Sequence, residues 1–183
     1  MILKNIHHKF LFAATVILLS GCSASENITT DKNLPNFYKI NSNLYRGGQL
    51  NEAGVKTLRE KYGIKTVILF RSKGENADRE RKWVESQGLK FLNLPLHNWF
   101  APKHDQVNAA LKEIIDAENQ PVFIHCNRGS DRTGTMIAVY RMTQEGWTAK
   151  EAKEEAEKFG IGWWQIWMRE YITDYHEEFV AEK

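Results

Sequence analysis

The chain carries a polar stretch at residues 125–133, His-Cys-Asn-Arg-Gly-Ser-Asp-Arg-Thr, which constrains the fold more than any other feature. The apolar run 121–124 precedes this stretch and a helix-like run, 135–140, follows it. A short apolar run that ends at a polar loop is typical of a buried strand. We therefore predict a strand that ends at Cys126 and a helix that begins near Arg132.

The loop between this strand and this helix is suited to bind an anion. A helix N-terminus offers backbone N–H groups without partners and a partial positive charge. The same field lowers the pKa of a thiol and makes it a nucleophile near neutral pH. Arg132 adds a planar guanidinium that matches two oxygens of one phosphate group. Cys126 and Arg132 are therefore the first candidate site residues.

The spacing His-Cys, five residues, Arg-Thr resembles the signature loop of the cysteine-dependent protein tyrosine phosphatases, especially the compact dual-specificity type. The resemblance implies that Cys126 is the nucleophile of a phosphocysteine mechanism and that Arg132 holds the phosphate. It implies that a hydroxyl near the sulfur, from Thr133 or Ser130, assists the leaving thiolate. The residues expected to bind the substrate phosphate are Asn127, Arg128, Gly129, Ser130, Asp131, Arg132 and Thr133.

The proton donor for the leaving group is harder to assign. The family usually supplies an aspartate from a loop before the helix that precedes the signature strand, but this chain has His97 and Asn98 there. Asp131 and Asp105 are the first candidates, and His97 is the third. Asp131 stands where the myotubularin and Sac-type phosphatases, which the loop resembles, place a proposed acid. It can equally hold its own loop together, and Asp105 can instead cap a helix.

Basic residues near the loop suggest one substrate class. Arg128 together with Lys103, Arg71 and Lys73 can make the rim of the pocket basic, which would suit a polyanionic substrate such as an inositol polyphosphate. Ordinary solvated charge is the alternative.

The first residues predict a targeting segment. A basic start with Lys4 and Lys9 precedes the apolar run 10–19, which is too short to span a bilayer. Leu-Ser-Gly-Cys at 19–22 then resembles the lipobox of bacterial lipoproteins. That resemblance implies cleavage before Cys22 and attachment of lipid to it; an ordinary secretory signal is the alternative.

This interpretation divides the chain into a signal peptide at 1–21, a lipid-anchored flexible tether at 22–36 and a phosphatase domain at 37–183. The tether is polar and rich in Ser, Asn and Thr. The expected location is the bacterial cell envelope. Because Ser23 follows Cys22, the sorting rule favours the outer membrane, facing the periplasm, if the host has two membranes.

Charge and composition exclude several classes of partner. The chain has 25 Lys and Arg against 23 Asp and Glu, and removal of Lys4 and Lys9 leaves 23 of each, so a nucleic-acid partner is not expected. Acylation of Cys22 would leave Cys126 alone, so no internal disulfide is expected. The histidines are scattered without ligand spacing, and we expect no metal and no cofactor. We expect a monomer.

The order of elements predicts an α/β fold with a central, mainly parallel sheet flanked by helices. Expected strands are 64–70, 89–94 and 121–124, with an edge strand or hairpin at 37–45 and a turn at 46–49. Expected helices follow Asn51, occupy 77–87, follow Asp105, follow the signature loop, follow Thr148 and begin near Trp163. The spacing of Trp163, Trp164 and Trp167 favours packing in the core over a substrate wall or a membrane surface.

Three functions remain open. The leading hypothesis is a metal-independent phosphatase that acts through phosphocysteine on phosphotyrosine proteins or inositol phosphates. A rhodanese-like sulfurtransferase also uses a loop cysteine after a strand, but the signature spacing favours the phosphatase. A lipid-anchored, non-catalytic module that binds phosphorylated ligands gains weight from the missing loop aspartate.

Overall fold

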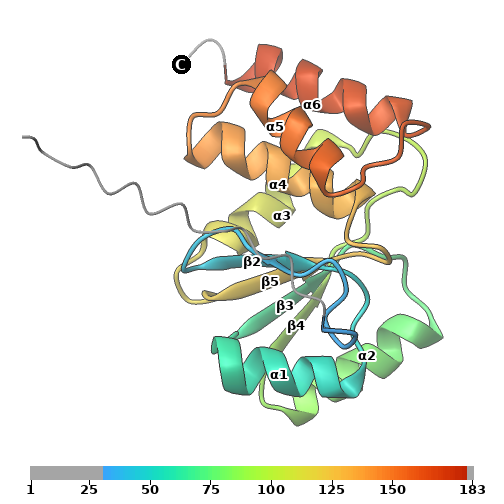
Figure 1. Ribbon diagram of the computed structural model, residues 1–183, viewed down its shortest axis with the longest axis vertical. Coiled ribbons are helices and arrows are strands. Elements are labelled where there is room, and N and C mark those ends of the chain that lie inside the picture. Colours follow the sequence, from blue (N-terminus) through green and yellow to red (C-terminus); the bar gives the residue numbers. More distant parts are fainter. Residues whose placement is uncertain (1–30, 181–183) are drawn as a thin grey trace, which may run out of the picture.

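The computed structural model describes residues 31–180, which contain one five-stranded sheet and six helices (Figure 1). The strands are β1 (Tyr38–Lys39), β2 (Leu44–Gly47), β3 (Thr66–Leu69), β4 (Lys90–Asn93) and β5 (Val122–His125). The helices are α1 (Glu52–Tyr62), α2 (Glu75–Ser86), α3 (His104–Ile115), α4 (Asp131–Gln144), α5 (Ala149–Lys158) and α6 (Ile166–Phe179).

The strand order is β1-β2-β5-β3-β4, with β1 antiparallel to β2 and all other neighbours parallel. Helices α1 and α2 cover one face of this sheet, and α3 to α6 cover the other (Figure 1). The predicted α/β fold with a mainly parallel sheet and flanking helices is confirmed. The described residues supply an extensive hydrophobic core of their own on both faces. We therefore expect this part of the chain to fold by itself.

Local sequence signals explain several elements. The Asn51 side chain accepts a hydrogen bond from Gly54 N and begins α1, and Gly63 ends this helix in the left-handed region at φ 64°. All four residues of β3 are buried, as its β-branched, apolar sequence predicts. Thr148 and Glu151 form the predicted capping box of α5.

The boundary between tether and domain differs from the prediction. Residues 31–36, assigned to the tether, pack against the domain: Leu34 is buried in the core, and Pro35 O accepts a hydrogen bond from Gly48 N. The segment was assigned to the tether because most of its residues are polar, but its single leucine, Leu34, is buried. The predicted signal peptide, Cys22 and the first part of the tether lie outside the described residues.

The prediction for the tryptophans is wrong. Trp163 is 79% exposed, Trp167 is 55% exposed and Trp164 is 43% exposed. The last helix begins at Ile166, not near Trp163, and its buried stripe is Met168, Tyr171, Ile172 and Tyr175. The apolar spacing therefore identified a helix, but the start of that helix was misplaced and the tryptophans were wrongly assigned to the core.

The sheet topology brings the loops that follow the parallel strands together at the carboxyl end of the sheet. In an open α/β sheet, ligands bind at the carboxyl ends of the strands, near the point where the strand order reverses. Here β5 lies between β2 and β3, so Cys126 follows the central strand. No helix among residues 31–180 is long and apolar enough to cross a membrane.

Candidate active site

The signature loop lies where the sequence predicts it. Strand β5 ends at His125, Cys126 is 1% exposed, and α4 begins at Asp131. A cavity of about 240 Å³ opens above the cysteine. It is lined by Asn98, Trp99, Cys126, Asn127, Arg128, Asp131, Arg132, Trp164 and Gln165. The structure therefore brings the nucleophile and the arginine of the signature together at a helix N-terminus.

Two glycines set the path of the loop. Gly129 has φ 76°, and a Cβ atom on it would lie 2.4 Å from Gly47 O, so only glycine fits there. Gly47 belongs to β2, where its own Cβ would collide with the Phe123 ring. The predicted turn at 46–49 is therefore partly wrong, because Arg46 and Gly47 form the end of a strand that runs beside the signature loop.

Arg46 is a buried cation beneath the loop, and no local pattern in the sequence predicts its position. Its Nη2 donates a hydrogen bond of 2.6 Å to Gly129 O, and its guanidinium lies 4.0 Å from the centre of the Phe159 ring. Burial lowers the pKa of Arg46 to about 10, and the charges of Glu155 and Cys126 oppose this shift. The side chain therefore stays positive at neutral pH and supports a loop that receives anions.

Arg132 and Thr133 each have a buried polar atom without a hydrogen-bond partner among the described residues. The Arg132 side chain donates from Nη1 to Phe70 O at 3.3 Å, while its Nε has no partner among the described residues. The Thr133 hydroxyl is buried and likewise unpartnered there. Ser130 Oγ accepts from Asn36 Nδ2 at 3.4 Å, which leaves its hydrogen to donate elsewhere. Both hydroxyls therefore remain candidates to assist the sulfur.

Asp131 connects the signature loop to a second loop. Its Oδ2 accepts from Arg128 Nη2 at 2.7 Å, and its Oδ1 accepts from Gly162 N at 2.9 Å. Gly162 precedes the tryptophan ring that lines the cavity, and a Cβ on Gly162 would collide with that ring, Trp164. Both carboxylate oxygens are thus occupied: Oδ1 holds the loop between α5 and α6, and Oδ2 pairs with Arg128 inside the signature loop.

The other two candidate acids lie outside the set of residues around Cys126. Asp105 is exposed in the first turn of α3, where its Oδ1 accepts from Gln106 N. Its predicted capping role is wrong, because the helix begins at His104, before Asp105, and the cap position is Lys103. His97 is exposed, and its Nδ1 accepts from the backbone N of the two aromatic residues Trp99 and Phe100.

Asn98 holds the position in the cavity where an acid would be useful. Asn98 lines the cavity above Cys126, and its backbone carbonyl accepts a hydrogen bond from Gln165 Nε2 at 3.1 Å. An amide cannot donate a proton as a general acid. The Oε1 atom of Gln165 is buried without a partner among the described residues, and this side chain also lines the cavity.

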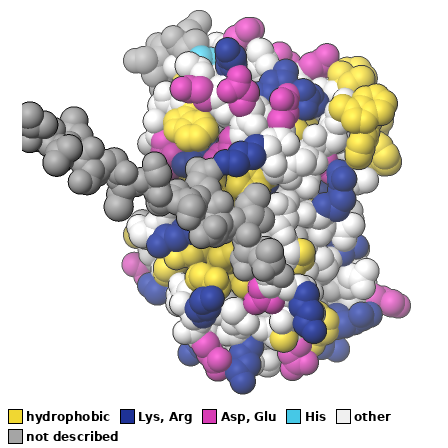
Figure 2. Space-filling view, in the orientation of Figure 1, with side chains coloured by type: hydrophobic (Ala, Val, Ile, Leu, Met, Phe, Trp, Pro, Cys, Tyr) yellow, Lys and Arg dark blue, Asp and Glu magenta, His cyan; other side chains and the backbone are white. Residues whose placement is uncertain are grey.

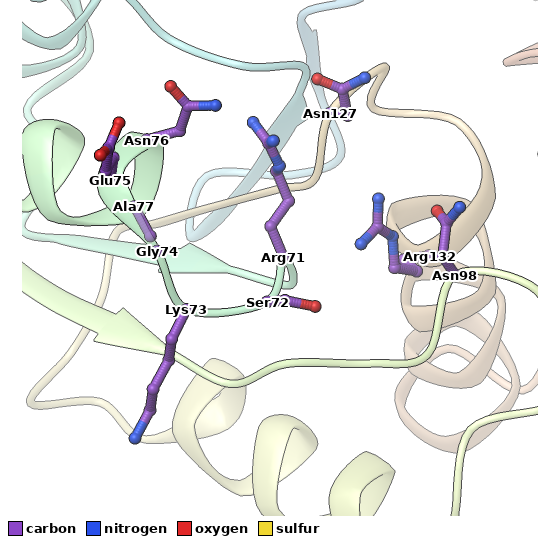
Figure 3. A pocket seen from close by; sticks show the side chains of 10 residues that line it. All are labelled: Arg71, Ser72, Lys73, Gly74, Glu75, Asn76, Ala77, Asn98, Asn127 and Arg132. Atoms are coloured by element: carbon purple, nitrogen blue, oxygen red, sulfur yellow. The ribbon is translucent and has the colours of Figure 1, made fainter.

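A second cavity of about 530 Å³ adjoins the first, with Asn98, Asn127 and Arg132 in both walls. Figure 3 shows Arg71 and Arg132 pointing into it from opposite sides, whereas Lys73 points away. The basic residues expected to form one rim therefore lie at separate places around the site. Arg71 lines the second cavity, Arg128 is paired with Asp131, and Lys103 lines a neighbouring cavity beside His97 and Phe100.

A chain of polar contacts links the signature to Arg71, and its two middle members, Glu80 and Gln49, were not identified as site residues from the sequence. His125 Nε2 lies 2.6 Å from Glu80 Oε1 on α2, and Glu80 Oε2 accepts from the Gln49 side chain. The Gln49 amide oxygen accepts from Arg71, and Gln49 N donates to Asn127 O at 2.8 Å. A polar Gly-Gly-Gln sequence directly after a strand was the only available signal.

The described residues show no group of three or more His, Cys, Asp and Glu side chains that could hold a metal ion.

Comparison with known proteins agrees with this geometry. Residues 24–165 match a family model described as DSP-PTPase phosphatase fused to NAD+ kinase. The chain is 32% identical over 130 residues to the dual specificity protein phosphatase TpbA of Pseudomonas aeruginosa, which covers 69% of this chain and 56% of that protein. The crystal structure of P. aeruginosa TpbA superposes with a TM-score of 0.69 at 27% identity, covering 83% of this chain and 91% of that chain.

Two eukaryotic proteins are similar along more of their length. A probable tyrosine-protein phosphatase, DG1060 of Dictyostelium discoideum, is 32% identical over 80% of this chain and 89% of its own. Inositol diphosphatase DSP5 of Arabidopsis thaliana is 29% identical over 77% of this chain and 70% of its own. The match to TpbA spans little more than half of that relative. With the signature cysteine and arginine in one cavity, the chain belongs to the DSP-PTPase family of cysteine-dependent phosphatases.

Proposed function

We propose that the chain is a metal-independent phosphatase that hydrolyses phosphate esters through a phosphocysteine intermediate. One observation carries the proposal: Cys126 and Arg132 line the same cavity at the N-terminus of α4, a 14-residue helix. A helix N-terminus and a guanidinium together bind a phosphoryl group and stabilise the negative charge of its transfer.

In the first step, the Cys126 thiolate attacks phosphorus and the bond from phosphorus to the leaving oxygen breaks. Arg132 has a free Nε in the cavity and holds the equatorial phosphoryl oxygens together with the loop amides. The leaving oxygen carries away the electron pair of the broken bond and takes up a proton.

In the second step, water attacks the phosphocysteine, the bond between sulfur and phosphorus breaks, and inorganic phosphate leaves. The unpartnered Oε1 of Gln165 in the cavity wall can accept a hydrogen bond from the attacking water. The buried hydroxyl of Thr133 can donate to the departing thiolate. The thiolate is thereby restored for the next turnover.

The choice of substrate follows from the leaving group. Asn98 stands in the cavity wall, and both oxygens of Asp131 are engaged, so the wall offers no unoccupied carboxyl group. A phenol or a phosphate leaves more readily than an alkoxide when no acid assists. We therefore favour phosphotyrosine and the diphosphate group of an inositol diphosphate over simple alkyl phosphates.

The adjoining cavity supports a substrate with a second negative group. Arg71 points into it beside Arg132 (Figure 3). An inositol phosphate would place a further phosphate there, whereas a phosphotyrosine peptide would place an acidic residue there. Both classes fit this charge pattern.

Phosphate release by residues 23–183, with reductant and chelator present, tests the function. The substrates are p-nitrophenyl phosphate, a phosphotyrosine peptide, an inositol diphosphate and inositol hexakisphosphate, with Cys126→Ser as control. We expect turnover that is lost in Cys126→Ser. Sulfur transfer from thiosulfate to cyanide without phosphate release would favour the sulfurtransferase. Tight binding of a phosphorylated substrate without turnover would favour the binding module.

We further propose that Cys22 is acylated and anchors the protein in the bacterial cell envelope, in the outer membrane facing the periplasm if the host has two membranes. The lipobox-like sequence at 19–22 supports this. Expression of the full chain and of Cys22→Ala, followed by metabolic labelling with palmitate and by membrane fractionation, tests it. Label in both proteins, or in neither, would exclude the anchor.

A further inference from the structure

Six exposed apolar side chains lie on the two loops that border the cavity above Cys126 and on the first turn of α6. We name them the aromatic rim: Trp99, Phe100, Trp163, Trp164, Ile166 and Trp167, with exposures between 43% and 79%. They are six of the eight large hydrophobic side chains exposed in residues 31–180. Figure 2 shows hydrophobic side chains gathered at the edge of the molecule where Figure 1 places the loop between α5 and α6. A contiguous apolar surface of this kind marks an interaction site.

The two loops that carry the rim are joined to each other. Gln165 Nε2 donates to Asn98 O at 3.1 Å, so the loop before α3 is tied to the loop before α6. Trp99 and Trp164 both line the cavity that contains Cys126. Trp99 and Trp164 are therefore the two rim residues at the cavity itself, whereas Phe100, Trp163, Ile166 and Trp167 lie beside them in the sequence without lining it.

The chemistry of the rim matches the interface between lipid and water. Tryptophan combines a large apolar ring with an N–H donor and is enriched at membrane surfaces. Cations lie beside the rings: the Arg128 guanidinium is 5.3 Å from the centre of the Trp164 ring, and Lys103 lines a cavity with Phe100. Basic groups next to apolar ones attract anionic headgroups while the rings enter the interface.

The position of the N-terminal segment indicates a membrane as the occupant. Asn36 donates to Arg128 O at 3.3 Å and to Phe159 O at 3.2 Å, so the chain enters the domain beside the signature loop. Between Cys22 and Asp31, a fully extended chain reaches roughly 30 Å. The proposed anchor at Cys22 would thus hold the signature loop close to a bilayer.

We propose that the aromatic rim docks the catalytic mouth onto the surface of a phospholipid bilayer. The inference rests on the proposed anchor for its choice of partner, but not on the proposed catalytic activity. Docking would restrict the enzyme to substrates presented at the membrane, either on proteins close to the bilayer or on lipid headgroups.

Sedimentation of residues 23–183 with vesicles of phosphatidylethanolamine and phosphatidylglycerol tests docking without the anchor. We expect the protein to pellet with the vesicles and its tryptophan fluorescence to shift to shorter wavelength. Trp163→Ala with Trp167→Ala should lower the vesicle affinity at least about tenfold, because two large apolar rings are lost from the interface. Neither ring lines the cavity above Cys126, so hydrolysis of soluble p-nitrophenyl phosphate should be unchanged.

Ile115→Ala is the matched control, since Ile115 is 43% exposed but lies at the far end of α3. It should leave vesicle binding unchanged. Protein that stays in the supernatant, or a double variant that binds as well as the wild type, would overturn the proposal. A double variant that loses only the affinity for a phosphotyrosine peptide would also overturn it and would identify the rim as a peptide surface. Because vesicle binding is measured without catalysis, an inactive but vesicle-bound protein would refute the proposed function alone.

Discussion

His125 Nε2 lies 2.6 Å from Glu80 Oε1, and neither side chain is exposed to solvent. The other ring nitrogen, Nδ1, lies 3.1 Å from Cys126 O. Both ring nitrogens thus lie next to oxygen atoms of the protein. The carboxyl group on α2 therefore contacts the residue that precedes the nucleophile.

Glu80→Ala is expected to destabilise the protein strongly. Removal of the carboxyl group leaves a buried ring nitrogen of His125 without its partner and costs about 1–3 kcal/mol. The free energy of unfolding in urea measures this loss. Glu85→Ala on the same helix is the control, because that side chain is 53% exposed and should change stability by less than about 0.5 kcal/mol. Equal effects of the two substitutions would show that the pair does not support the signature.

Arg132→Lys should abolish most of the activity. An ammonium group cannot form the two parallel hydrogen bonds of a guanidinium, so charge stabilisation in the transition state is lost. We expect kcat/KM for p-nitrophenyl phosphate to fall roughly 10²- to 10³-fold, as for the loss of an oxyanion donor. Inhibition by inorganic phosphate should weaken in parallel. Arg59→Lys on the exposed face of α1 should leave both measurements unchanged.

The substitution Asp131→Asn tests whether Asp131 is a general acid or a residue that only supports its loop. Because both carboxylate oxygens are engaged by Arg128 and Gly162 N, we expect a similar, less than about tenfold loss of kcat/KM on an aryl phosphate and on an alkyl phosphate. Asp105→Asn should have no effect on either substrate. A loss confined to the alkyl phosphate, whose leaving group needs the proton most, would identify the substituted residue as the general acid.

Glu151 makes stability depend on pH at the start of α5. Its hydrogen bond from the Thr148 backbone, followed by that from the Thr148 side chain, lowers the pKa of this carboxyl below its usual 4.5. A lowered pKa contributes stability that is present above pH 4.5 and is lost as the pH falls through the folded-state value.

The substitution Glu151→Gln should therefore reduce the loss of stability on acidification from pH 7. Urea unfolding of the wild type and of Glu151→Gln at a series of pH values measures this difference. Glu154→Gln, an exposed carboxylate on the same helix, is the control and should follow the wild type. Parallel curves for all three proteins would contradict the role of the capping box.

Much of the fold follows from signals that are local in the sequence. The β-branched run of β3, the Asn51 cap and the Gly63 stop of α1 each act within a few residues, so each predicts its element without knowledge of the rest. The signature loop is predicted for the same reason, because its strand, loop and helix are contiguous.

The rest of the site depends on contacts between distant segments. Arg46 reaches Gly129 across 83 positions, and Glu80 meets His125 only because α2 packs against the sheet beside β4. No periodicity in the sequence encodes these pairs. Trp163 and Trp164 were misjudged because apolar spacing cannot distinguish a buried helix face from an exposed loop that a distant carboxylate, that of Asp131, holds in place.

Mass spectrometry of the acid-quenched enzyme during turnover of p-nitrophenyl phosphate tests the central claim most directly. We predict one phosphoryl group on the peptide that contains Cys126, and none on the corresponding peptide of Cys126→Ser, which should release no phosphate. Phosphate release by Cys126→Ser, or turnover with the phosphoryl group found on another residue, would contradict the phosphocysteine mechanism.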